Sequence, residues 1–234
     1  MTRLIPSDIS ALALNWAELE RRLIDLAGLG FLGLAGETLG LSLPEAQRLL
    51  GGKKVAVIPN TSGEGLIEGF SQGLQRIANG LGCEAIVTSP DLQGHLEARE
   101  FQSELILTSD DINYYCQNTK TGTIAQNGHA TGLGFAHALY LMAKRQVSDE
   151  IVLVIGAGPV GAAAASHLSG LGARVILFDL DRQKALNVAS TLAKASAWSI
   201  GHGLIPGDFK LILEASTSPL VWPQESVQAE ATIS

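Results

Sequence analysis

The sequence is poor in cysteine, in aromatic residues and in positive charge. Its 234 residues include only two cysteines, Cys83 and Cys116, and neither belongs to a metal-binding or disulfide pattern. We therefore expect no structural metal and no disulfide framework. Lys and Arg total 16 against 23 Asp and Glu, which gives a formal net charge of −7. A surface for nucleic acid or anionic lipid needs clustered positive charge, so neither partner is expected.

No apolar run is long enough to cross a membrane. The longest, over residues 26–36, is broken by glycines and is shorter than the ~20 residues that a spanning helix needs. The first residues lack the apolar core and cleavage site of a signal peptide, so we expect a cytoplasmic protein. Hydrophobic residues make up 46% and charged residues 17% of the chain, which excludes disorder, and the 5% of aromatics predicts an aliphatic core.

The first half of the chain is predicted to begin with a helix and to continue as an α/β layer. Apolar residues recur every three or four positions over residues 9–26, which predicts an amphipathic helix after the capping residues 6–8. From Lys53 onward, strands and helices alternate, which favours parallel pairing. The expected elements after the first helix are a helix over 43–50, strands over 55–58, 85–87 and 104–107, helices over 67–78 and 135–145, and a polar stretch over 110–134.

A charged connector over residues 146–150 marks the predicted domain boundary. Residues 1–147 are expected to form a substrate-binding domain, and residues 148–234 a second α/β domain. In the second domain, an apolar strand over 151–155 leads through glycines into an alanine-rich helix and then into another strand. This order is typical of a Rossmann nucleotide-binding domain.

The glycine motif of the second domain carries the strongest functional signal. Gly156, Gly158 and Gly161 follow a strand and open a helix, and the next strand ends in Asp179. The glycines permit the tight turn, the approach of the backbone to a pyrophosphate and the packing of the helix on the strand, while the helix N-terminus attracts phosphate. The residues expected to bind the cofactor are Gly156, Ala157, Gly158, Pro159, Val160, Gly161, Asp179, Ala215 and Ser216.

Asp179 favours NAD over NADP, because its carboxylate can accept the ribose hydroxyls and would repel a 2′-phosphate. Arg182 lies three residues further on and leaves NADP open. The alternative for the whole motif is a tight strand–helix turn that binds no ligand. The polar segment 214–218 ends a later strand, where it either faces the nicotinamide or forms an ordinary loop.

Polar loops at strand ends are the candidates for the reacting groups of the first domain. Asp110 and Asp111 follow the strand over 104–107. One of this pair is expected to cap a following helix, and the other to meet a positively charged substrate. The loops 61–63 and 126–128 are similar and can hold polar substrate groups or serve only as loops. His129, in the polar stretch, is a minor candidate; the other histidines and both cysteines are more simply explained as packed or loop residues.

Several of these segments resemble the pyrrolysine-biosynthesis dehydrogenase family, in order and along nearly the whole chain. The segments of the first domain carry the specificity, because the glycine motif is common to many enzymes. They are VIPNTSGEGLI over 57–67, LILTSDD over 105–111, and Asn127 with Thr131 and Gly132; the second domain adds the glycine motif, Phe178-Asp179 and LILEAS over 211–216.

This resemblance implies an activity and a set of site residues. The family uses NAD⁺ to oxidise the terminal amine of a lysine–methylornithine isopeptide; ammonia leaves, and the semialdehyde closes the pyrroline ring of pyrrolysine. By resemblance, Asp110 matches the catalytic aspartate, Ser62 and Asn127 match residues that hold the substrate, and Leu4 matches a substrate contact on a mobile N-terminal helix that covers the site. A homodimer is also implied.

The chemistry of amine oxidation agrees with a carboxylate at the site. An ammonium group has no lone pair, so it cannot expel a hydride until it loses a proton. At pH 7, deprotonating an amine of pKa ~10.4 costs roughly 4–5 kcal/mol. A carboxylate such as Asp110 can first bind the cation and then accept or relay its proton, while the cofactor accepts the hydride.

Two alternatives to this function stay open, and the length of the second domain bears on both. One is another NAD-dependent dehydrogenase of small amines, amino acids or folates, and the other is a protein that binds NAD(H) without catalysis. The resemblance suggests that family members extend beyond Ser234, and strand counting predicts a Rossmann domain that stops after about its fifth strand. A missing last strand would expose a sheet edge.

Overall fold

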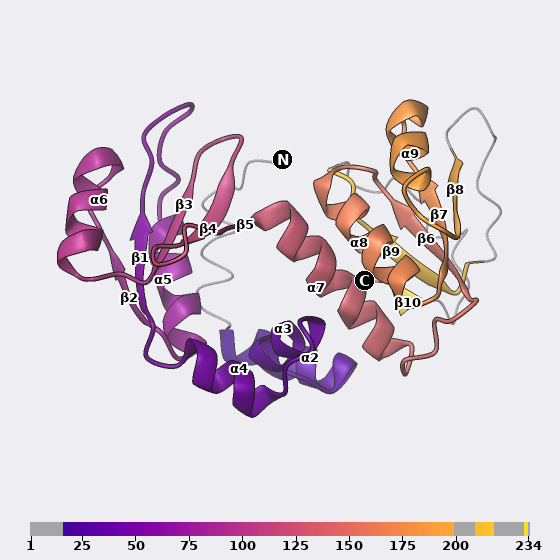
Figure 1. Ribbon diagram of the computed structural model, residues 1–234, viewed down its shortest axis with the longest axis horizontal. Helices are drawn as coiled ribbons and strands as arrows, with labels where there is room; N and C mark the ends of the chain where they lie inside the picture. Colours follow the sequence, from indigo (N-terminus) through magenta and orange to yellow (C-terminus); the bar gives the residue numbers. More distant parts are fainter. Residues whose placement is uncertain (1–15, 199–208, 218–231, 234) are drawn as a thin grey trace. The chain divides into compact units, whose positions relative to one another are not determined.

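The computed structural model describes residues 16–198, 209–217 and 232–233 of the chain. They form two compact units, unit 1 (Met1–Asn127) and unit 2 (Gly128–Ser234) (Figure 1). The sequence places the boundary at the connector after residue 147, whereas the structure divides the chain directly after Asn127. The reason lies in helix α7 (Asn127–Met142), because Ala136 and Leu139 of this helix are buried in the core of unit 2.

The described part of unit 1 begins at Trp16 with a group of short helices. The stacked rings of Trp16 and Phe31, 4.8 Å apart, join the first two helices, and Glu20 accepts a hydrogen bond from the N–H of Phe31 at 3.0 Å. The second helix lies in the glycine-rich passage that carries no helix prediction. A capping box of Ser42 and Glu45 opens the third helix. The three helices are α2 (Trp16–Ala27), α3 (Phe31–Thr38) and α4 (Leu43–Leu50).

The sheet of unit 1 is parallel in one part and antiparallel in the other. Its strand order is β2-β1-β3-β4-β5. The predicted parallel pairing holds for β1 with β2 and β3, but β4 and β5 form an antiparallel hairpin on the edge of β3. The polar stretch over 110–134 therefore contains two strands. The bounds are β1 (Lys54–Ile58), β2 (Glu84–Val87), β3 (Leu105–Ser109), β4 (Tyr114–Asn118) and β5 (Ile124–Gln126).

Two helices cover opposite faces of this sheet (Figure 1). Helix α5 (Phe70–Gly80) packs Ala78 against Val55 on one face, whereas α6 (Asp91–Glu100) packs Ala98 against Ala56 on the other. Successive residues of β1 thus point into two different layers, so the strand is apolar at every buried position. Because β1 is buried and pairs with β3, the packed sheet fixes the positions at which the loops after β1 and β3 begin.

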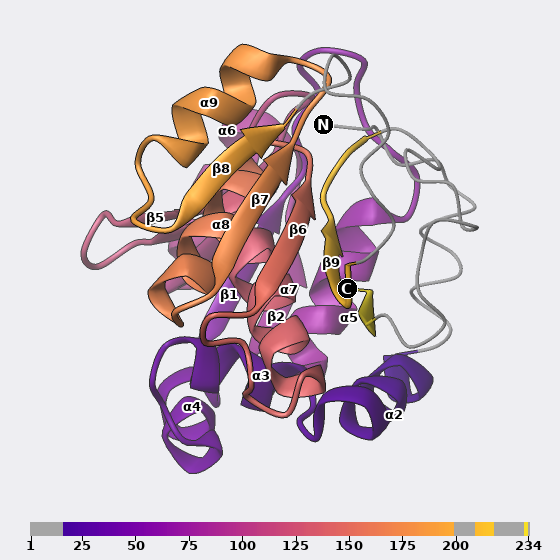
Figure 2. The same cartoon turned by 90° about the vertical axis from the view of Figure 1, so that its right-hand side faces the viewer.

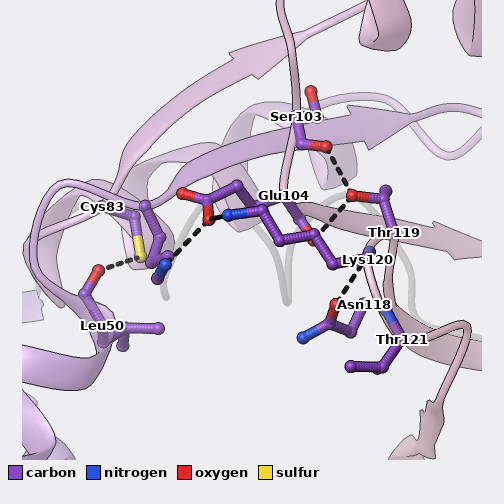
Figure 3. Close-up of polar contacts among 9 residues, drawn as sticks. Leu50, Cys83, Ser103, Glu104, Asn118, Thr119, Lys120 and Thr121 are labelled. Atoms are coloured by element: carbon purple, nitrogen blue, oxygen red, sulfur yellow. Dashed lines mark hydrogen bonds and ion pairs between the residues drawn. The ribbon is translucent and has the colours of Figure 1, made fainter.

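A polar cluster fastens the β4–β5 hairpin at the end of β3 opposite to those loops (Figure 3). Glu104 accepts ion-pair hydrogen bonds from Lys120 at 2.5 Å and from Lys53 at 2.8 Å. The hydroxyl of Thr119 donates to the carbonyl oxygen of Ser103 at 2.8 Å. The bonds from Lys120 and Lys53 lower the pKa of Glu104 to about 2. These contacts join the hairpin to the starts of β1 and β3.

Unit 2 has the Rossmann arrangement that the sequence predicts. Its strands are all parallel in the order β10-β9-β6-β7-β8, with β6 between β7 and β9 (Figure 2). Counted along the chain this order is 3-2-1-4-5 read from β8, the order of nucleotide-binding sheets. The strands are β6 (Ile151–Ile155), β7 (Arg174–Phe178), β8 (Ala195–Trp198), β9 (Leu211–Glu214) and β10 (Thr232–Ile233); the helices between them are α8 (Pro159–Gly170) and α9 (Arg182–Ala189).

Helices α7, α8 and α9 cover one face of this sheet with small side chains. Val152 and Val154 of β6 face the alanines of these helices, while Leu153 and Ile155 face the opposite layer. Helix α7 crosses α8 closely, since a Cβ added at Gly132 would lie 2.2 Å from the carbonyl oxygen of Val160. Among the described residues, no helix is long and apolar enough to cross a membrane.

Candidate functional site

The first candidate site is the glycine loop between β6 and α8 in unit 2. Gly156 has a φ of +95°, and its N–H donates to the carbonyl oxygen of Phe178 at 2.7 Å. A Cβ added at Gly156 would lie 2.7 Å from the carbonyl oxygen of Ala215. Both the backbone conformation and the contact with the end of β9 therefore require glycine.

The other two glycines of the loop differ in what surrounds them. A Cβ at Gly161 would overlap the carbonyl oxygen of Gly156 at 1.8 Å, whereas a Cβ at Gly158 would have no atom within 4 Å. Gly158 caps α8 in an extended conformation, Pro159 fills the first helical position, and Val160 follows in the first turn. Gly161 thus serves packing, and Gly158 leaves open space before the helix N-terminus. This space, with the N–H groups of the first turn, suits a pyrophosphate.

Asp179 fastens the glycine loop to the end of β7. Its Oδ2 accepts a hydrogen bond from the N–H of Ala157 at 2.7 Å, and its Oδ1 accepts one from the N–H of Asp181 at 2.8 Å. Each carboxylate oxygen has a second lone pair, so ribose hydroxyls can still donate to it. At the end of β9, the N–H of Ala215 donates to Ile155, and Ser216 donates to Glu214 at 2.7 Å. The residues predicted to bind the cofactor therefore meet at one edge of the sheet.

The second candidate site lies in unit 1, at the carboxyl ends of β1 and β3. A small pocket of about 50 Å³ opens there between the loop that follows β1 and the turn that follows β3. Asn60 and Asp110 line its polar side, and Ile67 and Phe70 line its apolar side. Parallel strands commonly place binding groups at their carboxyl ends. The pocket combines a carboxylate with an apolar wall.

Asp110 opens the turn from β3 to β4. Its Oδ1 accepts hydrogen bonds from the N–H of Asn113 at 2.6 Å and of Ile112 at 2.7 Å. These bonds, that of Asn113 first, lower the pKa of the Asp110 carboxyl below its ordinary value. The expectation that one acid of the pair caps a helix is wrong, because the next element is strand β4. Asp110 instead holds a turn and remains partly exposed in the pocket.

The loop after β1 is held by side-chain acceptors along its length. Asn60 Oδ1 accepts from the N–H of Ser62 at 2.9 Å and from its hydroxyl at 2.6 Å. Asp91, the first residue of α6, accepts from the N–H and the hydroxyl of Thr61. Asp111 Oδ2 accepts from the N–H of Glu64 at 2.7 Å. Ser62 is predicted from the sequence, whereas Asn60 and Asp91 are not. The only local signal for Asn60 is its place directly after Pro59 at a strand end.

Not every predicted site residue is brought into this pocket. Asn127 is half-buried at the start of α7, directly after β5, and Ser62 is exposed in the loop after β1; neither is among the residues that line the pocket. Leu4 and the first part of the predicted N-terminal helix lie outside the described residues. Within the described residues, no group of three or more His, Cys, Asp or Glu side chains is arranged to hold a metal ion.

Some titratable side chains prove to be packing residues. His137 of α7 is buried, and its Nδ1 lies 3.1 Å from Nε2 of His167 of α8. Burial, and then the charge of His137, lower the pKa of His167. His129 is exposed at the start of α7. In unit 1, Tyr114 packs edge-on against Phe70, and burial raises the pKa of Tyr114 to about 12.

Two family models match successive parts of the chain. Residues 20–125 match the N-terminal domain of the pyrrolysine biosynthesis protein PylD, and residues 129–201 match the C-terminal domain of the alanine dehydrogenase/PNT family. Two curated proteins named pyrrolysine synthase are 29% identical over 241 aligned residues that cover 100% of this chain. The one from Methanosarcina acetivorans is covered to 86% of its length, and the one from Methanosarcina barkeri to 84%.

Solved structures of dehydrogenases resemble this fold at low identity. Shikimate dehydrogenase from Aquifex aeolicus has a TM-score of 0.52 at 15% identity, with 78% of this chain and 77% of that chain covered. Quinate dehydrogenase from Corynebacterium glutamicum, in complex with NAD, has a TM-score of 0.50 at 12% identity, with 78% and 79% covered. At this identity the likeness concerns the fold alone.

Fold, glycine loop and relatives together define an oxidoreductase of the nicotinamide-dependent dehydrogenase class. Within this class, the chain is related along its full length to the pyrrolysine synthases. The resemblance to the pyrrolysine-biosynthesis dehydrogenases, predicted from the segments around Ser62 and Asp110, is thereby confirmed.

Proposed function

We propose that this chain oxidises the terminal amine of the lysine–methylornithine isopeptide and so forms pyrrolysine. The observation that carries the proposal is the pocket at the ends of β1 and β3, where a carboxylate and an apolar wall meet inside the domain that matches the pyrrolysine family model. An alkyl ammonium group has the matching chemistry, with one cationic end and an aliphatic stem. The ammonium group loses a proton and its carbon loses a hydride to the nicotinamide cofactor, which leaves an iminium. Water then adds and ammonia leaves, and the resulting aldehyde condenses with another amine of the substrate with loss of water.

Asp110 has the electrostatic properties of a cation-binding residue. Hydrogen bonds from Asn113 and Ile112 lower its pKa, so the side chain is a carboxylate throughout the neutral range. A carboxylate with a low pKa attracts an ammonium group but is a weak base. We therefore propose that Asp110 binds the cation and relays its proton, and that the protonated form of Asp110 does not accumulate.

Two further residues are proposed to hold the substrate. Ser62 donates its hydroxyl hydrogen to Asn60, so the lone pairs of its oxygen remain able to accept from a substrate N–H. The side chain of Asn127, at the first position of α7, offers both donors and an acceptor. On the apolar side of the pocket, Ile67 and Phe70 suit the methylene groups of the substrate.

The cofactor is proposed to be NAD. The glycine loop leaves room for a pyrophosphate at Gly158, and Asp179 stands at the end of β7 where the fold places an adenosine ribose. A 2′-phosphate would meet this carboxylate, which already accepts two backbone hydrogen bonds and cannot withdraw without loosening the loop. When bound, NAD⁺ supplies the acceptor for the hydride.

Exchange of Asp110 for Asn tests the assignment. The Asn side chain keeps an oxygen for the N–H groups of Ile112 and Asn113 but removes the charge. We expect NADH formation from the isopeptide, followed by absorbance at 340 nm, to fall by a factor of about 100 or more, as for loss of a proton-transfer residue. NADH binding should be unchanged.

The control is Glu45→Gln, which removes a carboxylate of α4 while keeping the capping geometry with Ser42. It should retain the activity of the unaltered protein. Near-normal turnover by Asp110→Asn would contradict the role of Asp110. No NADH formation by the unaltered protein, with activity on another amine, amino acid or hydroxy acid, would contradict the proposed substrate.

A further inference from the structure

The loop after β1 and the turn after β3 are joined by one acidic side chain, Asp111. Its Oδ2 accepts a hydrogen bond from the backbone N–H of Glu64 at 2.7 Å. Gly63 lies directly over the same carboxylate: a Cβ added there would be 1.9 Å from Oδ2. The contact spans 47 residues of sequence, so local turn geometry does not produce it. It joins the loop that carries Ser62 to the turn that begins with Asp110.

We propose that Asp111 is a positioning residue, which sets the distance between the substrate-holding loop and the catalytic turn. This inference rests on the proposed function, since it takes Ser62 as a substrate contact and Asp110 as the group that meets the amine. Ser62 lies in the loop after β1 and Asp110 in the turn after β3, and each is followed by exposed residues. The hydrogen bond from Glu64 to Asp111 fixes one of these loops against the other.

The loop after β1 needs a hydrogen bond of this kind because its glycines allow the backbone many conformations. Gly63 and Gly65 both have positive φ, at +69° and +81°, and glycine at these positions leaves the unrestrained loop many conformations. Restraining it before the substrate arrives removes part of the entropy cost of binding. Asp91 holds the same loop at Thr61, on the side of α6, but makes no connection to the turn after β3 in the described contacts. Among the described contacts, the bond from Glu64 to Asp111 relates the loop to the turn that begins with Asp110.

The competing role for Asp111 is direct binding of the ammonium group, since it also lines the pocket. The two roles require different properties of the side chain. Positioning needs an oxygen that accepts the N–H of Glu64, which an amide retains; cation binding needs the negative charge, which an amide lacks. Asp111→Asn and Asp111→Ala therefore separate the two roles.

The experiment compares steady-state kinetics on the isopeptide with hydrogen–deuterium exchange of residues 60–65. For Asp111→Ala we expect KM to rise by about tenfold, the effect of one lost hydrogen bond to a charged group, with a smaller change in kcat. The backbone of residues 60–65 should exchange faster, while NADH affinity stays the same. Asp111→Asn should restore both KM and the slow exchange.

The matched control is Glu45→Ala. It removes a carboxylate that accepts a backbone N–H at 2.8 Å, from Ser42, at the start of a helix that precedes β1. KM and the exchange of residues 60–65 should match the unaltered protein. Circular dichroism confirms that each variant is folded before it is compared.

The results that overturn the proposal are distinct from those that overturn the proposed function. If Asp111→Asn raises KM as much as Asp111→Ala, charge matters and Asp111 binds the cation instead of positioning the loop. If Asp111→Ala leaves the exchange of residues 60–65 unchanged, the connection does not restrain the loop. If the unaltered protein does not oxidise the isopeptide, the proposed function fails, and the exchange measurement still decides whether Asp111 holds the loop.

Discussion

The two units place polar groups at the carboxyl ends of parallel strands, but they fix those groups by different means. In unit 2 the backbone itself makes the site, through the positive φ of Gly156 and the close contact of Gly161 with the strand end. In unit 1 the site depends on side chains that reach across the sequence, such as Asp91 to Thr61 and Asp111 to Glu64. The site of unit 2 is fixed by backbone conformation, and the site of unit 1 by side-chain hydrogen bonds between loops.

This difference has consequences for stability as well as for function. The loop of unit 2 rests on buried packing, because α7, α8 and α9 bury Val152, Val154 and their neighbours almost completely. The loops of unit 1 are exposed, and the hydrogen bonds that hold them compete with water. Changes at the packed positions of the glycine loop should therefore affect the fold, whereas changes to the connections of unit 1 should affect binding first.

The strongest test of this contrast is Gly161→Ala. Its Cβ would meet the carbonyl oxygen of Gly156 at 1.8 Å, and this contact is with backbone, which no side-chain rotation can relieve. We expect a loss of stability of about 3 kcal/mol, as for an overpacked core position. Thermal unfolding followed by circular dichroism measures it.

The matched control for this change is Gly158→Ala, which places a Cβ where no atom lies within 4 Å. It should fold with nearly normal stability and lose cofactor affinity by about tenfold, or about 1.4 kcal/mol, because the methyl group occupies the space for the pyrophosphate. Equal stability of the two variants would show that the glycine loop is not held by packing.

The backbone-encoded parts of the fold are the parts that the sequence predicts best. The strands β6 and β7, the helix α8 and the glycine loop follow from an apolar run, a glycine pattern and an alanine-rich segment. Helices α3, α6 and α9 are missed. Glycines interrupt α3, and Leu92 and Leu96 of α6 are exposed, so neither of these two helices shows an apolar stripe. Strands β4 and β5 are missed because their segment is polar and becomes recognisable as a hairpin only through the pairing of β4 with β3 and of β5 with β4.

The same reasoning explains which site residues the sequence reveals. Asp179 follows from its distance along the chain from the glycines, and Asp110 from its place after a strand and from the family resemblance. The roles of Asp91 and Asp111 depend on contacts between segments that lie far apart in sequence. The role of Asn60 depends on a local turn in which its side chain accepts from Ser62. No local pattern predicts that Glu64 donates to Asp111. A site made of long-range connections becomes visible only when the strands are in register.

A change of intermediate size, Gly63→Ala, sharpens the contrast within unit 1. Alanine at this position would have to adopt the positive φ of Gly63, and its methyl group would displace the carboxylate of Asp111. The strain costs about 1–2 kcal/mol. The lost bond to Glu64 should add a rise in KM for the isopeptide of about tenfold.

Gly65→Ala separates strain from the loss of the connection. This position has a φ of +81° but no atom within 4 Å of an added Cβ. It should lose similar stability and show a smaller rise in KM. If both alanine variants change KM alike, strain alone accounts for the effect and the contact between Gly63 and Asp111 has no part in it.

The smallest expected effect is a difference in acid sensitivity between the two units. The folded state of unit 2 lowers the pKa of His167 below 6.5, through burial and the charge of His137. The unfolded chain then binds the proton more readily, so this contribution to stability is complete above about pH 6.5 and is lost as the pH falls through that value. In unit 1, Lys120 and Lys53 lower the pKa of Glu104 from 4.5 to about 2, so its contribution is lost only below about pH 4.5.

Hydrogen exchange between pH 7.5 and 5, corrected for intrinsic rates, should therefore show earlier loss of protection in β7 of unit 2 than in β3 of unit 1. His167→Gln should flatten the pH dependence of β7 in this range, and Glu104→Gln should leave it unchanged, because Glu104 in the folded protein does not titrate there. Equal loss of protection in β3 and β7, or no effect of His167→Gln, would show that the histidine pair has no share in the acid response.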